Sequence, residues 1–193
     1  MAITPSTMLP IGTLAPEFAL PDAVSGKVIT RSAFDGTPLL VLFICNHCPF
    51  VKHLRGHFGP FFRDAMKRGL AVVAISANDV AEYPEDAPAL MTKEAAAAGW
   101  PFPYLYDESQ AVARAYRAAC TPDFFLFGKD HRLAYRGRYD DTRPARAGQG
   151  GSSPTGSDLG SAIADVLAGR PVAIAQKPSM GCNIKWKPGN EPA

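Results

Sequence analysis

The chain has 193 residues, of which 47% are hydrophobic and 20% charged, and its formal net charge is +2. These values are close to the averages of soluble globular proteins, and they exclude intrinsic disorder, collagen and coiled coil. The longest apolar stretch, residues 38–45, is far shorter than the roughly 20 residues that a membrane-spanning helix needs. The N-terminus lacks a secretory signal, and the small charge gives no reason to expect nucleic acid. We therefore expect a soluble, cytoplasmic protein with no membrane or nucleic-acid partner.

The first half of the chain predicts a strand–helix–strand unit. A short hairpin is expected within residues 15–30. Residues 38–45 form an unbroken apolar run of strand length, which is typical of a strand buried on both faces. Residues 49–68 change to helical spacing, although the Gly-Pro pair at 59–60 is expected to bend or interrupt this helix. Residues 70–76 read as a second buried strand, so we expect a right-handed crossover and parallel pairing.

The second half predicts shorter helices and strands, bounded by glycines and turn residues. In chain order we expect helix 86–99, strand 104–106, helix 109–118, strands 123–127 and 132–138 paired as a hairpin, loop 140–156 and helix 157–168. The expected fold class is therefore α/β, with a central mixed sheet flanked by helices, an N-terminal hairpin and a C-terminal extension. Residues 1–168 are predicted to form one domain, and residues 169–193 a tail packed on or near it.

The chemical centre of the sequence is Cys-Asn-His-Cys-Pro at residues 45–49. Two cysteines with this spacing, between a buried strand and a helix, favour a redox-active disulfide. We expect Cys45 to lie at the helix N-terminus, where the helix dipole and unpaired amides lower the pKa of a thiol. His47 adds a donor and, when protonated, a positive charge. Cys45 is thus the expected attacking thiol, and Cys48 the expected resolving thiol.

Two further cysteines lie far from this pair in the sequence. Cys120 comes two residues before Pro122, and a cis bond before Pro122 would expose backbone groups for pairing with an extended substrate. Cys120 is either a small buried hydrophobic residue or an auxiliary redox thiol. Cys182 either pairs with Cys120, relays oxidation from the first pair, or stays a thiol. Trp186 is expected to anchor the tail by apolar burial.

Three histidines at positions 47, 53 and 57 offer a second interpretation of the same segment. With Cys45 and Cys48 they could form a Cys/His metal site. His53, however, lies five residues after Cys48, roughly 140° around a helix from it. The sequence favours histidines on a solvated helix face, and we expect neither a metal nor a bound cofactor.

These motifs resemble the alkyl-hydroperoxide-reductase/thiol-specific-antioxidant (redoxin) branch of the thioredoxin-like superfamily. The likeness rests on residues 12–18, on residues 45–49 and on Thr121-Pro122, and it spans about residues 10–168. Segments 46–53 and 181–186 resemble an uncharacterised redoxin group within that branch. The resemblance implies an extended thioredoxin fold and thiol–disulfide chemistry, with Cys45 as the attacking thiol.

The peroxide-reducing relatives carry a Pro-x-x-x-Thr/Ser-x-x-Cys pattern. Counted back from Cys45, Pro38 keeps the proline position, but Leu42 replaces the hydroxyl residue. We therefore expect a thiol–disulfide oxidoreductase that takes protein or small-molecule disulfides as substrates and a thiol as electron donor. A thiol-dependent peroxidase and a non-catalytic metal-binding or interaction module on the same fold are the alternatives. The expected catalytic residues are Cys45, His47, Cys48 and Pro122, with Cys120 and Cys182 as auxiliary redox candidates.

Overall fold

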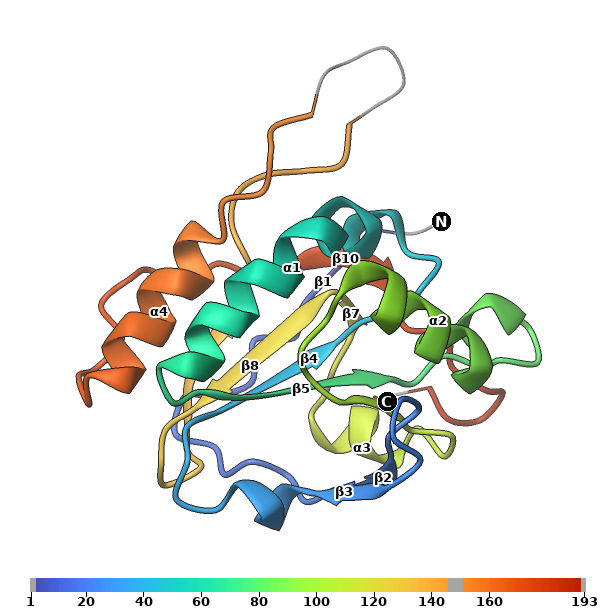
Figure 1. Cartoon of the computed structure of the whole chain (residues 1–193), viewed down its shortest axis with the longest axis horizontal. Helices are drawn as coiled ribbons and strands as arrows, with labels where there is room; N and C mark the ends of the chain where they lie inside the picture. Colours follow the sequence, from blue (N-terminus) through green and yellow to red (C-terminus); the bar gives the residue numbers. More distant parts are fainter. Residues whose placement is uncertain (1–2, 146–150, 192–193) are drawn as a thin grey trace.

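A five-stranded mixed sheet forms the centre of the computed structural model, which describes residues 3–145 and 151–191. The strand order is β6-β5-β4-β8-β9, with β4, β5 and β6 parallel and with β8 and β9 antiparallel to their neighbours (Figure 1). This is the central mixed sheet that the sequence predicts. Its strands are β4 (Leu39–Phe43), β5 (Ala71–Ser76), β6 (Tyr104–Tyr106), β8 (Asp123–Phe127) and β9 (Leu133–Gly137).

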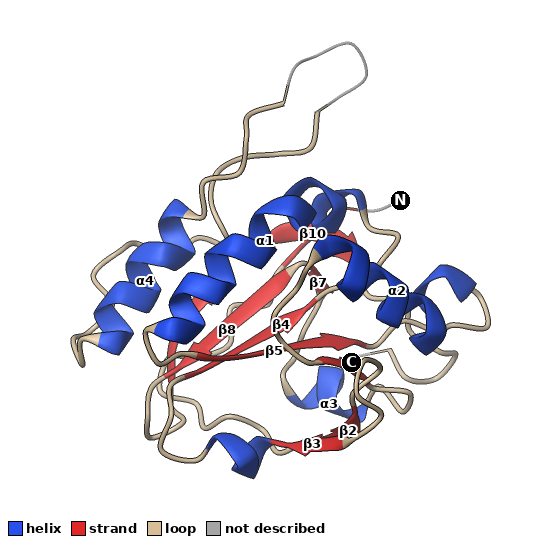
Figure 2. Ribbon diagram, viewed as in Figure 1, coloured by secondary structure: helices blue, strands red, loops and turns tan. Residues whose placement is uncertain are grey.

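Two hydrophobic cores lie on the two faces of this sheet. One face is covered by α1 (Pro49–Lys67), α2 (Pro88–Ala98) and α4 (Ser157–Leu167). The other is covered by α3 (Ala111–Ala115) and by the N-terminal segment, which contains the antiparallel hairpin β2 (Ala19–Pro21) and β3 (Val28–Thr30) and the short helix η1 (Arg31–Phe34) (Figure 2). Every residue of β4 is buried, as expected for an apolar strand enclosed on both faces.

Helix α1 differs from the expectation because it continues through Pro60. Pro60 removes one backbone donor, so the carbonyl of Gly56 loses its partner within the helix. Both residues are exposed, and solvent can replace the missing donor there. On the opposite side, Phe58 and Phe62 are fully buried and pack against each other. Their burial holds both halves of the helix on the sheet, and the predicted interruption is wrong.

Two other predicted helices are shorter than expected. The predicted helix 86–99 begins only at Pro88, the first residue of α2. Asp86 instead ends a separate 3-10 turn, η2 (Pro84–Asp86). Gly99 ends α2 in the left-handed conformation, as predicted. The predicted helix 109–118 is reduced to α3, and Arg117 follows with a positive φ that a continuing helix does not allow.

The predicted loop 140–156 is organised by one carboxylate, although its residues 146–150 lie outside the described part of the chain. Asp140 accepts hydrogen bonds from the amide of Thr142 at 2.9 Å and from the amide of Gly156 at 2.8 Å. Both ends of the loop are therefore fixed to the same side chain.

A second, three-stranded sheet, which was not predicted from the sequence, pairs segments from near the two ends of the chain. Its order is β1 (Ile3–Pro5), β10 (Met180–Asn183) and β7 (Cys120–Thr121), all antiparallel. After β10, Trp186 packs against the core on the sheet face that α3 and the N-terminal segment cover, as predicted for an anchor of the tail. None of the helices in the described residues has the length and apolarity required to cross a membrane.

Candidate active site

The cysteine pair lies where the chain leaves the carboxyl end of β4 and enters α1, facing the turn between β7 and β8. The Thr121–Pro122 bond in that turn is cis, which confirms the expectation from the sequence. Cys45 Sγ lies 3.4 Å from Thr121 Oγ1, and Cys48 in its thiol form donates from Sγ to the Thr121 carbonyl oxygen at 3.1 Å, a bond that its thiolate does not make. Both thiols are reduced and buried, with exposed fractions of 1% and 0%.

Cys48, and not Cys45, stands at the N-terminus of α1. The helix begins at Pro49 with Cys48 as its N-cap residue, so the expected position of Cys45 is wrong. Proline disfavours the helical conformation in the residue before it, so Cys48 is extended and the helix begins at Pro49. Asp86 Oδ1 accepts from Asn46 N at 2.7 Å and from His47 N at 3.3 Å. The positive end of the helix dipole and the unpaired amides of the first turn therefore act on Cys48.

The electrostatics of the two thiols follow from this placement. Hydrogen bonds from the Cys182 thiol and then from the Cys45 thiol lower the pKa of Cys48, against the opposing effect of burial. The Val51 amide also contributes to this lower pKa. The pKa of Cys45 is raised, first by its hydrogen bond to Cys48, then by burial and by the negative charge of Asp86. Both directions favour a negative charge on Cys48 over one on Cys45, the opposite of the order expected from the sequence.

Asp86 is a site residue that the sequence analysis missed. It is fully buried, its Oδ2 lies 2.7 Å from His47 Nδ1, and the same oxygen accepts from Asn78 Nδ2 at 2.7 Å. The hydrogen bond to Asp86 raises the pKa of His47 despite partial burial. Burial pushes the pKa of Asp86 upward, but the hydrogen bonds from His47 and Asn78 outweigh it and keep this pKa below its usual value. The two side chains form a hydrogen-bonded histidine–carboxylate pair next to the cysteines.

One signal in the sequence could have indicated Asp86. The carboxyl ends of parallel strands meet at one edge of a sheet, and polar residues that follow them converge there. Asn78 and Asp86 follow strand β5, which pairs in parallel with β4. The predicted βαβ unit therefore placed them near the residues that follow β4.

An aromatic ring fixes the other side of the histidine. The rings of His47 and Tyr83 are stacked with centroids 5.2 Å apart, and Lys185 Nζ lies 5.5 Å from the centroid of the Tyr83 ring. His47 Nε2 is buried and has no hydrogen-bond partner among the described residues. The imidazole is therefore oriented by Asp86 at Nδ1 and by Tyr83 at its face, while Nε2 makes no hydrogen bond within that part of the chain.

Metal-ligating atoms also converge at this site. One atom each from Cys45, His47 and Asp86 lie within 4.8 Å of one another, which is close enough for a shared metal ion. Both carboxylate oxygens already accept hydrogen bonds from protein groups. The two histidines of helix α1 have other partners. His53 Nε2 lies 2.9 Å from Thr142 Oγ1, and His57 Nδ1 lies 2.6 Å from the Tyr139 hydroxyl. The Cys/His metal site considered from the sequence is therefore not formed by His53 and His57.

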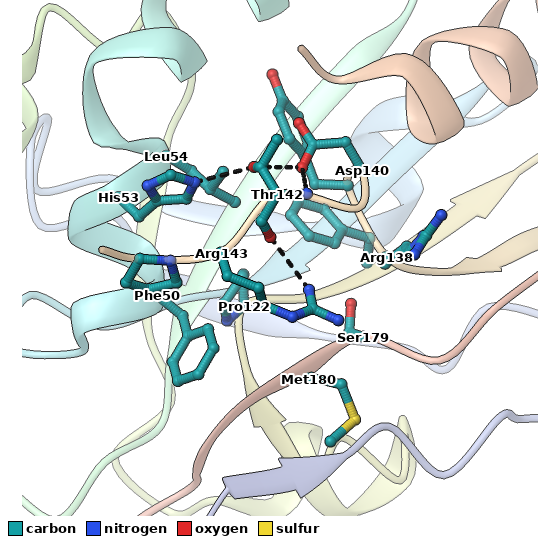
Figure 3. Close-up of a pocket in the computed structure, with 13 residues that line it drawn as sticks. Phe50, His53, Leu54, Pro122, Arg138, Asp140, Thr142, Arg143, Ser179 and Met180 are labelled. Carbon is teal, nitrogen blue, oxygen red and sulfur yellow. Dashed lines mark hydrogen bonds between the residues drawn. The ribbon is translucent and has the colours of Figure 1, made fainter. Parts of the chain in front are cut away.

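Pro122 also borders a surface pocket between the first turns of α1, the loop after β9 and β10 (Figure 3). Phe50 and Met180 give this pocket apolar walls, and Arg143 adds a positive charge. A neighbouring hollow of about 630 Å³ shares these three side chains and reaches Pro49, next to Cys48. The surface beside the cysteines is thus concave and partly apolar, and it carries the carboxylates of Asp140 and Asp141 as well as Arg143.

The other two cysteines occupy different environments near the same turn. Cys120 directs its thiol toward the Pro122 carbonyl oxygen at 3.6 Å, and burial raises its pKa far above the ordinary value. Burial likewise raises the pKa of Asp123 to about 8. Cys182, in β10, stands opposite Thr121, and its hydrogen bond to Cys48 raises the pKa of Cys182. The structure therefore brings Cys45, Cys48 and Cys182 together.

Comparison with known proteins places this geometry in a family. The model described as the AhpC/TSA family matches residues 11–136, about two thirds of the chain. The chain belongs to the AhpC/TSA family. Two solved structures resemble the chain over nearly their full length. An uncharacterised conserved protein from Geobacillus kaustophilus is 46% identical, with 98% of each chain covered and a TM-score of 0.91. A hypothetical protein from Sinorhizobium meliloti 1021 is 48% identical, covers 96% of this chain and 100% of its own, and has a TM-score of 0.90.

More distant structures share the fold of this AhpC/TSA protein. A putative thiol:disulfide interchange protein DsbE from Chlorobium tepidum is 20% identical and has a TM-score of 0.60, with 82% of this chain and 99% of that chain covered. A comparison with functionally curated proteins finds no significant match. Family and fold together identify a thioredoxin-like redox protein.

Proposed function

We propose that the protein is a thiol–disulfide oxidoreductase in which Cys48 attacks and Cys45 resolves. The observation that carries this proposal is the position of Cys48 at the N-cap of α1, where the helix dipole acts on it and neighbouring thiols donate to its sulfur. A thiolate, and not a thiol, is the nucleophile in disulfide exchange. The proposal therefore exchanges the roles that the sequence alone gives to the two cysteines.

The reaction begins with the Cys48 thiolate and a substrate disulfide. Cys48 sulfur attacks one substrate sulfur, the substrate S–S bond breaks, and one half of the substrate leaves as a thiolate that takes up a proton. The other half remains bound to Cys48 as a mixed disulfide. Cys45 then loses its proton and attacks Cys48, which forms the Cys45–Cys48 disulfide and releases the second half as a thiol. An external thiol reduces the pair again.

The coupling between the two thiols explains how Cys45 can become reactive at the second step. Its pKa is raised chiefly by the hydrogen bond to Cys48, and the charge of Cys48 adds to this effect. Formation of the mixed disulfide removes the negative charge from Cys48 sulfur. Both contributions then disappear, so the pKa of Cys45 falls when its thiolate is needed.

The surrounding residues have supporting roles in this proposal. The His47–Asp86 pair places a positive imidazolium near Cys48, and attraction between this charge and the Cys48 thiolate raises the pKa of His47. By reciprocity, the imidazolium stabilises that thiolate. Pro122, with Phe50 and Met180, forms the wall of a groove for an extended substrate. Partners would be protein or small-molecule disulfides and a thiol donor in the cytoplasm, and no bound cofactor is required.

Burial sets a condition on this reaction. Cys48 has no exposed surface in the reduced structure. A substrate disulfide reaches the Cys48 sulfur only after neighbouring residues move aside. Cys48 should therefore react with bulky reagents more slowly than an exposed thiol of the same low pKa.

A peroxidase reaction is less well supported once Cys48 is the nucleophile. Counted back from Cys48, the Pro-x-x-x-Thr/Ser-x-x-Cys pattern falls on Val41 and Cys45, so neither the proline nor the hydroxyl residue is present. Loss of a hydrogen-bond donor to the transition state commonly lowers the rate by roughly two to three orders of magnitude. We therefore propose disulfide exchange as the main activity.

Two measurements test the proposal. A Cys45→Ser variant, which retains the nucleophile but lacks Cys45 as resolving partner, should take up glutathione on Cys48 as its first product when treated with oxidised glutathione. In competition, the reduced wild-type protein should react with oxidised glutathione in preference to hydrogen peroxide. Fast, saturable peroxide consumption dependent on Cys48 would instead assign the protein as a peroxidase, and mixed disulfides found on Cys45 in Cys48→Ser alone would restore the reverse roles.

A further inference from the structure

Strand β10 brings a third thiol to the cysteine pair from the far end of the chain. It lies between β1 and β7, and its register sets Cys182 opposite Thr121. Thr121 is also the residue whose carbonyl oxygen accepts from Cys48 and whose hydroxyl lies 3.4 Å from Cys45 Sγ. One residue of the cis-proline turn is thus shared by all three cysteines.

The approach of β10 to this turn is unusually close, and a glycine permits it. A Cβ atom added to Gly181 would lie 2.0 Å from the carbonyl oxygen of Thr121 and 2.7 Å from its carbonyl carbon. Any other residue at 181 would push the strand away. Cys182 is the next residue, and it is 2% exposed. The sequence Gly181-Cys182 therefore fixes a buried thiol against the turn that holds the active-site cysteines.

Cys48 interacts with both of the other thiols. Its sulfur accepts hydrogen bonds from Cys45 and from Cys182. Among the described residues, three potential metal-ligating atoms lie within 4.8 Å of one another in one group, that of Cys45, His47 and Asp86. The three thiols of Cys45, Cys48 and Cys182 do not form such a group. The thiols thus form a chain with Cys48 at its centre rather than a closed triangle suited to one metal ion. A chain of this kind suits exchange between neighbouring sulfurs.

We propose that Cys182 is a second resolving thiol, which competes with Cys45 for the mixed disulfide on Cys48; this inference rests on the proposed function. Cys182 loses its proton and attacks Cys48 sulfur, the bond between Cys48 and the substrate breaks, and the substrate leaves as a thiol. The product is a Cys48–Cys182 disulfide, which links the start of α1 to β10. Attack by Cys45 on Cys48 then forms Cys45–Cys48 and returns Cys182 to a thiol. This second step is a thiol–disulfide exchange within the protein, so it needs no further oxidant.

Cys120 supplies a matched control. It is as buried as Cys48, and it belongs to β7, the strand beside β10. Its thiol, however, points to the Pro122 carbonyl oxygen, and no hydrogen bond joins it to Cys48 among those of the described residues. A Cys120→Ser substitution removes a nearby thiol without removing a member of the proposed chain.

The decisive experiment treats reduced variants with oxidised glutathione and follows the linkages by mass spectrometry of digested protein. Cys45→Ser should first carry glutathione on Cys48, then release it and form Cys48–Cys182. Cys45→Ser/Cys120→Ser should do the same. Cys45→Ser/Cys182→Ser should keep its glutathione, with release slower by on the order of 100-fold, because an intramolecular thiol acts at a high effective concentration.

The outcomes separate this inference from the proposed function. If Cys45→Ser keeps glutathione on Cys48 as long as the double variant lacking Cys182 does, Cys182 is not a resolving thiol, while the attack by Cys48 stands. If oxidised glutathione neither forms the Cys45–Cys48 disulfide in the wild-type protein nor binds Cys48 in Cys45→Ser, the proposed function itself fails. Thermal unfolding of each variant shows whether it is folded, and the test relies on Cys45→Ser, in which Cys182 is intact.

Discussion

Two regions that meet at the Thr121–Pro122 turn contain equally buried thiols with opposite electrostatics. At the start of α1, Cys48 receives hydrogen bonds from two thiols and an amide, and its pKa is lowered. In the β7–β8 segment, burial dominates, so the pKa of Cys120 is raised and that of Asp123 rises to about 8. Both cysteines have no exposed surface. Burial alone makes a thiol inert, and donors directed at the sulfur reverse that effect.

The largest expected effect separates the two thiols by activity. Cys48→Ser should lower the rate of glutathione-disulfide reduction by roughly three decades or more, since it removes the nucleophile. Cys120→Ser should leave the rate within about twofold, because its thiol takes no part in exchange. Steady-state kinetics of both variants measure this, with circular dichroism to verify folding. Similar losses in the two variants would end the distinction between the regions.

Asp123 tests the β7–β8 side through pH. Its pKa is about 8 when folded and about 3.9 when unfolded. Between these values the unfolded chain releases the proton while the folded protein retains it, so this carboxyl makes the protein less stable as pH rises. Asp123→Asn removes that contribution, and the variant should gain about 3 kcal/mol relative to the wild type between pH 5 and pH 8. Urea unfolding at both pH values measures it; an unchanged difference would show that Asp123 is ionised when folded.

Gly181 tests how closely the tail strand joins the turn. Gly181→Ala places a methyl group 2.0 Å from the Thr121 carbonyl oxygen, and forcing the strands apart should cost about 2–3 kcal/mol in the free energy of unfolding. The matched control is Gly56→Ala in α1, where nothing lies within 4 Å of the added Cβ and the helix should gain up to about 1 kcal/mol. Equal stability of Gly181→Ala and the wild type would contradict the close approach of β10.

The smallest expected effect concerns the His47–Asp86 pair. The raised pKa of His47 means that its contribution is complete below the unfolded value of about 6.5 and is lost as pH rises through the folded pKa. The lowered pKa of Asp86 means that its contribution is lost as pH falls through the folded pKa. Asp86→Asn should therefore destabilise the protein by about 1 kcal/mol, most strongly between about pH 4 and 6.5.

A surface carboxylate gives the control for this pair. Asp64→Asn removes an exposed partner of Arg68 at i,i+4, which should change stability little at any pH. Ring resonances of His47 followed by nuclear magnetic resonance should also show a lower pKa in Asp86→Asn. A His47 pKa that is unchanged by the substitution would show that Asp86 does not hold the imidazolium.

Local patterns predicted the parts of this fold that depend on local order. The unbroken apolar run gave β4, the helical spacing from Pro49 gave α1, and Gly99 marked the end of α2. The continuation of α1 through Pro60 was not predictable, because it depends on the burial of phenylalanines against a sheet that the local sequence does not contain.

The site was predictable in composition but only in part in its arrangement. The cysteine spacing and Thr121-Pro122 identified its members. The start of α1 at Pro49 follows from the restriction that proline places on Cys48, a local rule that could have been applied to the sequence. The contact of Asp86 with the amides of residues 46 and 47 depends on the fold and was not predictable. The contact of Cys182 with Cys48 likewise depends on the long-range pairing of β10 with β7. Such contacts are set by topology rather than by local sequence.

The central claim is that Cys48 forms the thiolate, and ultraviolet thiolate absorbance as a function of pH tests it without requiring access to a buried sulfur. Reduced wild-type protein and Cys45→Ser, whose hydroxyl can still donate to Cys48, should both show a thiolate that titrates well below the ordinary cysteine value of about 8.5. Cys48→Ser should show no thiolate in that range. A low-pH thiolate that persists in Cys48→Ser and disappears in Cys45→Ser would contradict the account.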